Sequence, residues 1–285
     1  MKTNWSKGLV TWTEDNTAFI SAVFSWNLDK AYQQAVYYQN KGYHVKVGGP
    51  SITNNPQRFG MFDLTGSPDA LARHNPDATF TSRGCIRNCS FCAVPKIEGK
   101  LVELDDWKVK PIICDNNLLA CSDVHFDKVI DRLLENDING IDFNQGLDAR
   151  LLTDCHAGRF AELPKDTIIR LAWDNLKTEV KYRNAFNKCV SHGIDPKQIR
   201  VYVLIGYKDT PKDARYRLET VLEMGALPNP MRYQPLDAPK RNIYTDKNWT
   251  DRELKDYMRY YARSLFFRRM KIGFDDYKAY YGRTS

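Results

Sequence analysis

Along most of the chain, segments whose apolar residues are spaced as in a strand alternate with segments whose apolar residues are spaced as in a helix. Near the amino terminus, an apolar run over residues 17–26 predicts a buried strand, and residues 27–42 have apolar positions at helical spacing. Residues 43–52 predict a second strand that runs into a Gly-Gly-Pro turn. Strand, helix and strand within roughly 35 residues are typical of a small βαβ unit. Residues 53–78 contain three prolines and two glycines and predict a connector.

The same alternation recurs from residue 79 to residue 234. It predicts six strands, over residues 79–83, 110–117, 138–144, 166–173, 198–206 and 230–234. It predicts helices between them, over residues 123–136, 147–163, 179–193 and 211–225. Strands that alternate with helices imply a parallel sheet, open or closed. Residues that follow these strands therefore lie at the carboxyl edge of the sheet, where barrel-like α/β folds carry their chemistry.

The composition is that of a globular protein. Hydrophobic residues make up 42% and charged residues 27% of the chain, which excludes a chain that is disordered throughout. No apolar run approaches the ~18 residues that a membrane span needs, and the amino terminus lacks the apolar stretch of a signal peptide. We therefore expect a cytoplasmic protein with no membrane partner, in which thiols stay reduced. The odd number of cysteines, seven, also argues against a disulfide framework.

Three of these cysteines, Cys85, Cys89 and Cys92, lie within eight residues in the segment TSRGCIRNCSFCAVPKIEG. A structural zinc site usually takes two pairs of ligands, and no second pair is visible, but His74 or another cysteine could supply a fourth ligand. A [4Fe–4S] cluster also usually takes four thiolates, so three would leave one iron open, as in catalytic metal sites. The spacing favours a cluster, with zinc and chance packing as the alternatives.

The segment resembles the signature of the radical S-adenosylmethionine (SAM) enzymes. RGCIRNCSFCAVPKIEG is similar to the cluster loop of their methylthiotransferase and cobalamin-domain-associated branches, and the resemblance continues more weakly along residues 79–234. It implies an α/β fold with a partial (β/α)6 TIM-like barrel over residues 79–236. A short βαβ unit with its connector, residues 1–78, precedes the barrel, and a basic, tyrosine-rich helical extension, residues 237–285, follows it.

The resemblance also implies the activity. Cys85, Cys89 and Cys92 would hold a [4Fe–4S] cluster whose open iron binds the amino and carboxylate groups of SAM. One electron from a flavodoxin- or ferredoxin-type donor would cleave SAM to methionine and a 5′-deoxyadenosyl radical, which abstracts hydrogen from a substrate that the sequence does not identify.

Contacts to SAM are implied residue by residue. Phe91, before the third cysteine, matches an aromatic position beside the adenine. Asp115, Asn116 and Asn117 occupy the place of a segment that contacts the SAM amino group, although the glycines usual there are missing. Carboxylate and amide oxygens can accept hydrogen bonds from an ammonium group. The same residues are also typical of a turn before a helix.

The remaining implied contacts follow the later strands. Arg150 matches a basic residue near the SAM carboxylate, and the guanidinium of Arg150 could bind that carboxylate with two hydrogen bonds. Asp174, and after it Asn175, lie where the family contacts the ribose, and Gly206 would let the backbone approach the adenine. An arginine at a helix start, or polar residues that end a strand, would also be ordinary on a surface.

The chain departs from both branches of the family. Residues 1–84 contain no cysteine, so methylthiolation, which needs an upstream cluster, is not expected. The Asp-x-His-x-x-Gly segment that supplies a cobalt ligand is absent, so cobalamin is not expected. The competing hypothesis is a non-catalytic zinc- or iron–sulfur-containing protein that binds nucleic acid.

That hypothesis rests on the carboxyl-terminal tail. Of the net charge of +7, residues 240–285 contribute +6, from twelve Lys or Arg against six Asp or Glu. Thr250 and Glu253 have capping-box spacing and predict a helix from about residue 251. Its apolar stripe would be Leu254, Met258, Tyr261 and Leu265, and beside it lie three basic residues, the tail cations: Lys255, Arg259 and Arg263. With seven tyrosines after residue 240, this mixture suits phosphate contacts and base stacking, so tRNA or DNA is the slightly favoured substrate or partner. A peptide or protein, or a small molecule, is the alternative, and a solvated helix that closes one end of the barrel would have the same pattern.

Overall fold

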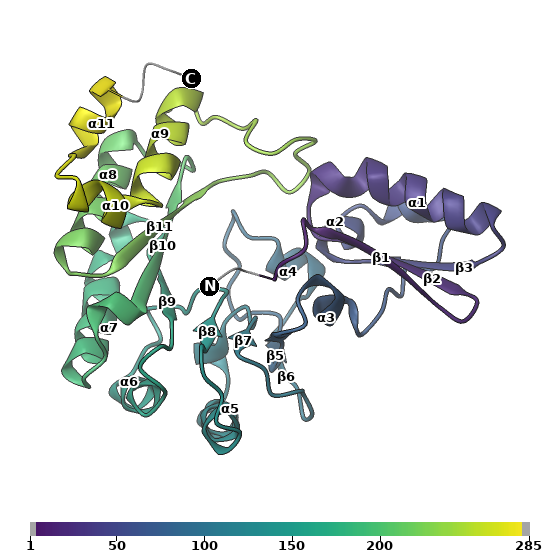
Figure 1. Cartoon of the computed structure of the whole chain (residues 1–285), viewed down its shortest axis with the longest axis horizontal. Coiled ribbons are helices and arrows are strands. Elements are labelled where there is room, and N and C mark those ends of the chain that lie inside the picture. The colour runs from purple at the N-terminus through teal and green to yellow at the C-terminus, as the bar shows by residue number, and fades with distance from the viewer. Residues whose placement is uncertain (1–3, 281–285) are drawn as a thin grey trace.

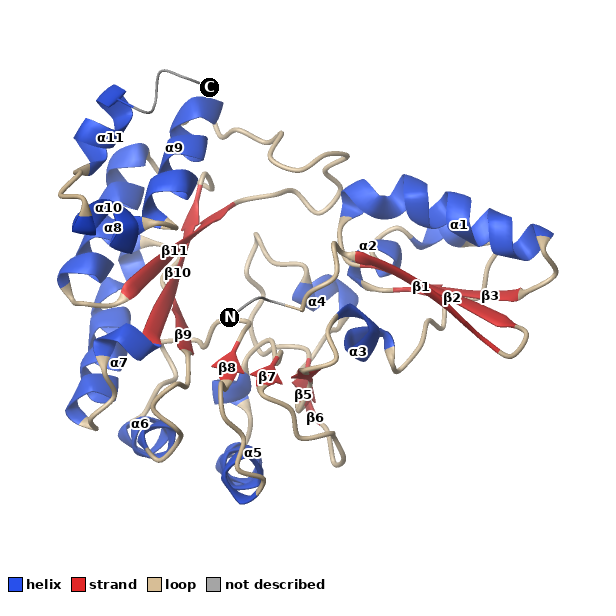
Figure 2. Cartoon of the chain, viewed as in Figure 1, coloured by secondary structure: helices blue, strands red, loops and turns tan. Residues whose placement is uncertain are grey.

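The structure, a computed structural model, describes residues 4–280 and has a mixed α/β architecture (Figures 1 and 2). Its amino-terminal unit is a three-stranded sheet of β1 (Leu9–Glu14), β2 (Thr17–Ala22) and β3 (His44–Gly48), with β1 antiparallel and β3 parallel to the central β2. Helix α1 (Leu28–Asn40) connects β2 to β3 and packs on this sheet. The predicted βαβ unit is confirmed, and β1 is an additional strand. The unit has a hydrophobic core of its own.

The connector that follows contains short helices. These are α2 (Pro50–Thr53), a 3-10 turn (Pro56–Phe59) and α3 (Ala70–His74). Up to residue 77 this segment forms no strand and no helix longer than five residues, as predicted for a connector. It leads the chain from the amino-terminal unit to the larger sheet.

The larger part of the chain contains six strands that pair in parallel. They are β4 (Ala78–Thr79), β7 (Ile112–Ile113), β8 (Asp142–Phe143), β9 (Ile169–Ala172), β10 (Ile199–Ile205) and β11 (Leu227–Arg232). The order is β4-β7-β8 in one sheet and β9-β10-β11 in another, and the parallel bridges Asp142–Ile168 and Leu147–Leu171 connect β8 to β9. In Figure 1 the strands β7 to β11 follow one another along a curve that does not close within the described chain.

The strand predicted over residues 79–83 is divided in two. After β4 the chain forms β5 (Ser82–Arg83), which pairs antiparallel with β6 (Val102–Glu103). Between these two lie the cysteine loop and the short helix α4 (Val94–Ile97). The β5–β6 pair therefore closes the base of that loop.

Four helices cover the outer side of the curve (Figure 1). They are α5 (Asp123–Glu135), α6 (Asp154–Ala161), α7 (Glu179–Ser191) and α8 (Pro211–Glu223). Side chains of Ser122, Thr153 and Thr210 cap α5, α6 and α8, which fixes where these helices begin. Further 3-10 turns are Ser25–Asn27, Leu118–Ala120, Leu176–Thr178 and Pro196–Gln198. The buried faces of the helices and strands form one large core.

The tail forms α9 (Asp251–Tyr261), α10 (Ser264–Arg269) and α11 (Phe274–Tyr280). The predicted capping box at Thr250 is confirmed. Leu265 is 52% exposed, so its predicted place on the buried stripe is wrong, because α9 ends at Tyr261 and α10 starts a new helix.

The tail tyrosines also differ from expectation. Tyr257, Tyr260, Tyr261 and Tyr277 are buried in the same core as the large sheet. Burial removes these four rings from contact with bases, which corrects the stacking expectation for them. The tail cations are exposed. No helix in the described part of the chain is long and apolar enough to cross a membrane.

Candidate cofactor site at the cysteine loop

The cysteine loop leaves the sheet at a glycine that no other residue could replace without a shift of the backbone. Gly84 has a φ of +73°, and a Cβ there would lie 2.0 Å from the carbonyl oxygen of Lys100. The backbone N–H of Cys85 donates to the carbonyl of Gly99 at 3.3 Å, which closes the loop. The amide of Cys92 donates to the carbonyl of Cys89 at 3.0 Å, so the last two cysteines lie on one tight turn.

All three cysteines line one cavity of about 550 Å³. Its other walls come from residues that follow the strands β7, β8 and β9 and from residues within β9, β10 and β11. Carboxyl ends of parallel strands meet at one edge of a sheet, and this is the edge where α/β folds bind ligands. Six of the eight implied SAM contacts line this cavity: Phe91, Asn116, Asn117, Arg150, Asp174 and Asn175.

The three thiols are free and partly buried. The Sγ of Cys85 accepts from the backbone N–H of Arg87 at 3.3 Å and from Nδ2 of Asn117 at 3.6 Å. Burial raises the pKa of the Cys89 thiol, which the Arg150 guanidinium opposes. Burial also raises the pKa of Cys92, against a hydrogen bond from the backbone of Val94. Donors directed at sulfur stabilise thiolate ligands, and a bound metal would deprotonate them.

Within residues 4–280, no three or more His, Cys, Asp or Glu side chains are grouped so that they could hold one metal ion. A single ion needs ligand atoms that meet at one point, whereas in an iron–sulfur cluster the thiolates bind different irons.

Asn117 has an unused acceptor in the cavity wall. Its Nδ2 donates to Cys85, but its Oδ1 is buried and has no hydrogen-bond partner. An unpaired buried polar atom is costly, and such atoms in native structures often await a ligand or water. Asn116 is held differently, because its Nδ2 donates to Oε2 of Glu98 at 2.7 Å.

Phe91 stands at the rim of the cavity. Its ring contacts the ring of Tyr207 edge-on, with centroids 5.7 Å apart, and the Tyr207 hydroxyl donates to the Oγ of Ser90 at 2.8 Å. These contacts tie the cysteine loop to the turn after β10. The aromatic face of Phe91 is therefore fixed in place.

Arg150 is engaged with a neighbouring carboxylate. Its Nε and Nη2 donate to the two carboxylate oxygens of Asp148 at 2.6 and 2.9 Å, and Nε of Arg87 donates to the same carboxylate at 3.0 Å. Burial would raise the pKa of Asp148, but the hydrogen bonds and charges of Arg150, with a hydrogen bond from Arg87, lower it. The Arg150 guanidinium also acts on the Cys89 thiol by charge and through a hydrogen bond, so it lies between Asp148 and the cysteine loop.

Asp174 carries the most perturbed carboxyl group of the cavity. It has no hydrogen bond or ion pair with any residue between 4 and 280, although Arg217 and Arg150 are close enough to act on it by charge. Burial raises the pKa of this carboxyl to about 6, against those two charges. A perturbed, unpartnered carboxyl in a cavity is typical of a functional group. The next residue, Asn175, is exposed, and its backbone carbonyl accepts from Nε1 of Trp173 at 2.9 Å.

Two implied contacts do not line the cavity. Asp115 is buried behind it and accepts from the backbone N–H of Thr81 at 2.6 Å and from the Ser82 hydroxyl at 2.8 Å. These bonds join the ends of β4 and β7. Gly206 faces the tail, because a Cβ there would lie 2.9 Å from Cδ2 of Leu254.

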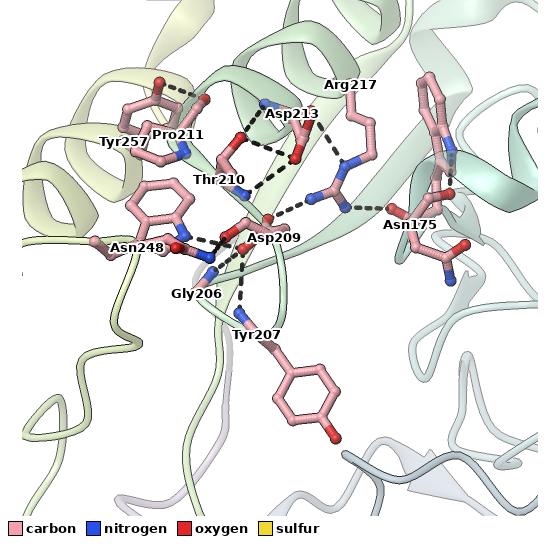
Figure 3. A network of polar contacts seen from close by, with 12 residues as sticks. Asn175, Gly206, Tyr207, Asp209, Thr210, Pro211, Asp213, Arg217, Asn248 and Tyr257 are labelled. Carbon is pink, nitrogen blue, oxygen red and sulfur yellow. Dashed lines mark hydrogen bonds and ion pairs between the residues drawn. The ribbon is translucent and has the colours of Figure 1, made fainter.

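Figure 3 shows what organises the chain at Gly206. Oδ1 of Asp209 accepts from the backbone N–H of Gly206 at 3.0 Å and from Nε1 of Trp249 at 2.9 Å. Its Oδ2 pairs at 2.6 Å with Arg217, whose side chain is fully buried. Thr210 caps α8. The turn after β10 therefore holds the tail against the sheet.

Several residues of the cavity were not predicted from the sequence. Gln145, Asp148, Tyr202 and Met231 line it, as does Arg87 within the cysteine loop. The polar segment NQGLDAR, at the end of the third predicted strand, could have indicated Gln145 and Asp148 as cavity residues. Tyr202 and Met231 lie inside strands and gave no such signal.

The chain was compared with known proteins in three ways. No protein-family model, no curated protein and no solved structure matches it.

Proposed function

We propose that this chain is a radical SAM enzyme, with a [4Fe–4S] cluster held by Cys85, Cys89 and Cys92 and SAM in the adjoining cavity. The observation that carries the proposal is that the three thiols of the x3, x2 loop line one cavity together with unpartnered polar groups. A volume of about 550 Å³ lies within the ~300–1,000 Å³ of small-molecule sites.

The course of the strands supports the proposal. Six parallel strands in an unclosed curve, with helices outside, are the arrangement expected of a partial (β/α)6 barrel. The cysteine loop follows the first of them, at the carboxyl edge. Arrangement alone does not imply function, so the proposal depends on the chemistry of the cavity.

Several polar groups of the cavity would have a role in binding SAM. Oδ1 of Asn117 would accept from the ammonium group, and the guanidinium of Arg150, which Asp148 holds in place, would donate to the carboxylate. Asp174 would accept from the ribose hydroxyls, with Asn175 beside it, and the ring of Phe91 would cover the adenine. In this arrangement Asp115 and Gly206 are positioning residues.

A [4Fe–4S] cluster held by the three cysteines would supply reductive cleavage of SAM, with one electron from a flavodoxin- or ferredoxin-type donor, and the resulting 5′-deoxyadenosyl radical would abstract hydrogen from substrate. The protein binds and orients the reactants and keeps water from the site. Its own contribution here is the half-buried cysteine loop, which Phe91 and Tyr207 hold against the sheet.

Iron content tests the proposal most directly. Protein reconstituted anaerobically should contain about four irons with labile sulfide, as expected for one [4Fe–4S] cluster. Changing Cys85, Cys89 or Cys92 to Ala should each remove the cluster and SAM cleavage. Changing the exposed Cys155 to Ser is the matched control and should leave iron unchanged.

The other cysteines sharpen the same test. Cys114, Cys121 and Cys189 are buried, and their Ser variants should keep iron in whatever protein folds. Colourless protein with one zinc would instead support the non-catalytic hypothesis. Loss of iron in any of these three variants would mean that the cluster ligands are not the three cysteines of the loop.

A further inference from the structure

A second cavity, of about 490 Å³, lies between the amino-terminal unit and the cysteine loop. Its walls come from the turn after β3, from α3, from α4 and from the ends of β5 and β7. Asn116 and Gln145 line both this cavity and the cofactor cavity. The two spaces are therefore neighbours, separated by these two side chains.

The second cavity has an apolar wall and two charged side chains, Arg83 and Glu98. Phe80, Val94 and Ile97 supply part of the apolar wall. His74 also lines the cavity, but burial lowers the pKa of its imidazole, and the ring is held by Ser6 and Ser21 at 2.6 and 3.0 Å. The charges that can meet a ligand here are those of Arg83 and Glu98.

Arg83 is held ready to bind an anion. Its Nε donates to Oε2 of Glu98 at 2.9 Å, and its Cζ lies 3.8 Å from the centroid of the Phe80 ring. The two terminal nitrogens of the guanidinium have no partner among the described residues, and the side chain is 39% exposed. An arginine fixed at Nε and stacked on a ring presents a preorganised fork for a carboxylate.

Glu98 fixes this fork in place. Its Oε2 accepts from three donors, the Nε of Arg83, the backbone N–H of Gly84 at 2.9 Å and Nδ2 of Asn116 at 2.7 Å. The side chain is only 11% exposed, so the bonds are shielded from water. Arg83, Gly84 and Asn116 thus belong to one polar cluster that borders the cofactor cavity.

We propose that this second cavity is the substrate pocket and that it takes a small organic carboxylate, whose anionic end binds the fork of Arg83. The inference rests on the proposed function for its link to SAM. One guanidinium, already partly neutralised by Glu98, suits a single negative charge better than a phosphate dianion. The apolar wall takes the carbon body, and Gln145, whose amide has no partner among residues 4–280, lies between that body and the cofactor cavity.

Binding to a probe panel tests the pocket. The panel holds straight-chain and phenyl-substituted carboxylates of increasing length, each with its neutral amide and its phosphonate, and binding to the reconstituted full chain is measured by calorimetry. We expect at least one carboxylate to bind at least tenfold more tightly than its amide and its phosphonate. Arg83→Gln should remove this preference, and Arg83→Lys should keep the charge but lose most of the affinity.

Arg73→Gln is the matched control. Arg73 also pairs with a carboxylate, Glu14, and lies over a ring, that of Trp12, at 5.2 Å, but it does not line either cavity. Its replacement should leave carboxylate binding unchanged. The proposal is overturned if no carboxylate binds the wild type more tightly than Arg83→Gln, or if the phosphonates bind best. If Arg83→Gln does not fold, the same comparison is made with Arg83→Lys.

Two further measurements separate this inference from the proposed function. Iron content and SAM cleavage are recorded on the same samples. If the protein contains no iron but still binds a carboxylate through Arg83, the pocket proposal stands and the radical SAM assignment is refuted. In iron-loaded protein, a bound carboxylate should change the rate of 5′-deoxyadenosine formation at least twofold. An unchanged rate at saturating carboxylate would overturn the assignment of the pocket to substrate.

Discussion

Replacing Asp174 by Asn should make the cofactor-free protein more stable and its SAM binding weaker. The carboxyl of Asp174 has no hydrogen-bond partner in the described chain, and burial raises its pKa from the ordinary 3.8 to about 6, against the charges of Arg217 and Arg150. Asparagine has the same shape as the protonated acid and carries no charge to desolvate. The variant therefore removes a cost that the native protein bears for its site.

The size and pH dependence of this gain follow from the pKa. One pKa unit corresponds to about 1.36 kcal/mol, so the shift amounts to about 3 kcal/mol. Below pH 3.8 both folded and unfolded chains are protonated and the cost is absent. Between pH 3.8 and about 6 the unfolded chain loses its proton first, so native stability falls as pH rises, and above about 6 the full cost is present. For a chain of 285 residues, about 3 kcal/mol raises Tm by roughly 5 °C.

Thermal unfolding of protein purified under reducing conditions with a chelator measures the gain. Asp148→Asn is the control of opposite sign, because two arginines hold the pKa of Asp148 low despite its burial. That variant should lose about 2 kcal/mol above neutral pH, and less as pH falls. The reasoning is refuted if Asp174→Asn is less stable than wild type at neutral pH, or if its gain is the same at pH about 4.

Three further changes test other parts of the structure. Asp209→Asn leaves the buried Arg217 without its counter-charge and should cost about 3–5 kcal/mol in urea denaturation, and a loss under about 1 kcal/mol would contradict the pairing. Thr250→Ala removes the capping box of α9 and should cost about 1 kcal/mol, whereas Thr250→Ser should cost much less. Changing all three tail cations to Ala should lower the slope of log affinity for duplex DNA against log salt by up to about 2.7, and an unchanged slope would exclude them from phosphate contact.

The sequence predicted the order of elements well because that order depends on local patterns. Apolar runs and helical spacing indicated the six parallel strands and the four helices between them, and the cap at Thr250 was readable from its three-residue spacing to Glu253. Strand β1 was missed, because its residues are half-buried or exposed and give no apolar run.

The site was predicted less completely, since contacts between distant segments leave no local signal. Asp115 and Asn117 are two residues apart, yet one bonds to the end of β4 and the other borders the cysteine loop. Gly206 was matched to the family by its position after a strand, but a glycine is needed there because Leu254 of the tail packs against it. The pairing of Arg83 with Glu98 depends on how the loop folds back, which residue types alone do not reveal.

The carboxylate of Asp209 has a consequence for how the chain is made. It accepts from Trp249, and helix α9 packs on β11 at the edge of the large sheet. A ribosome produces residues 199–232 before residues 249–277, so the last strands exist for a time without the helices that cover them. During that interval the apolar edge of the sheet is open to water and to other nascent chains. We therefore expect truncation before Trp249 to yield aggregated protein, whatever cofactors are supplied.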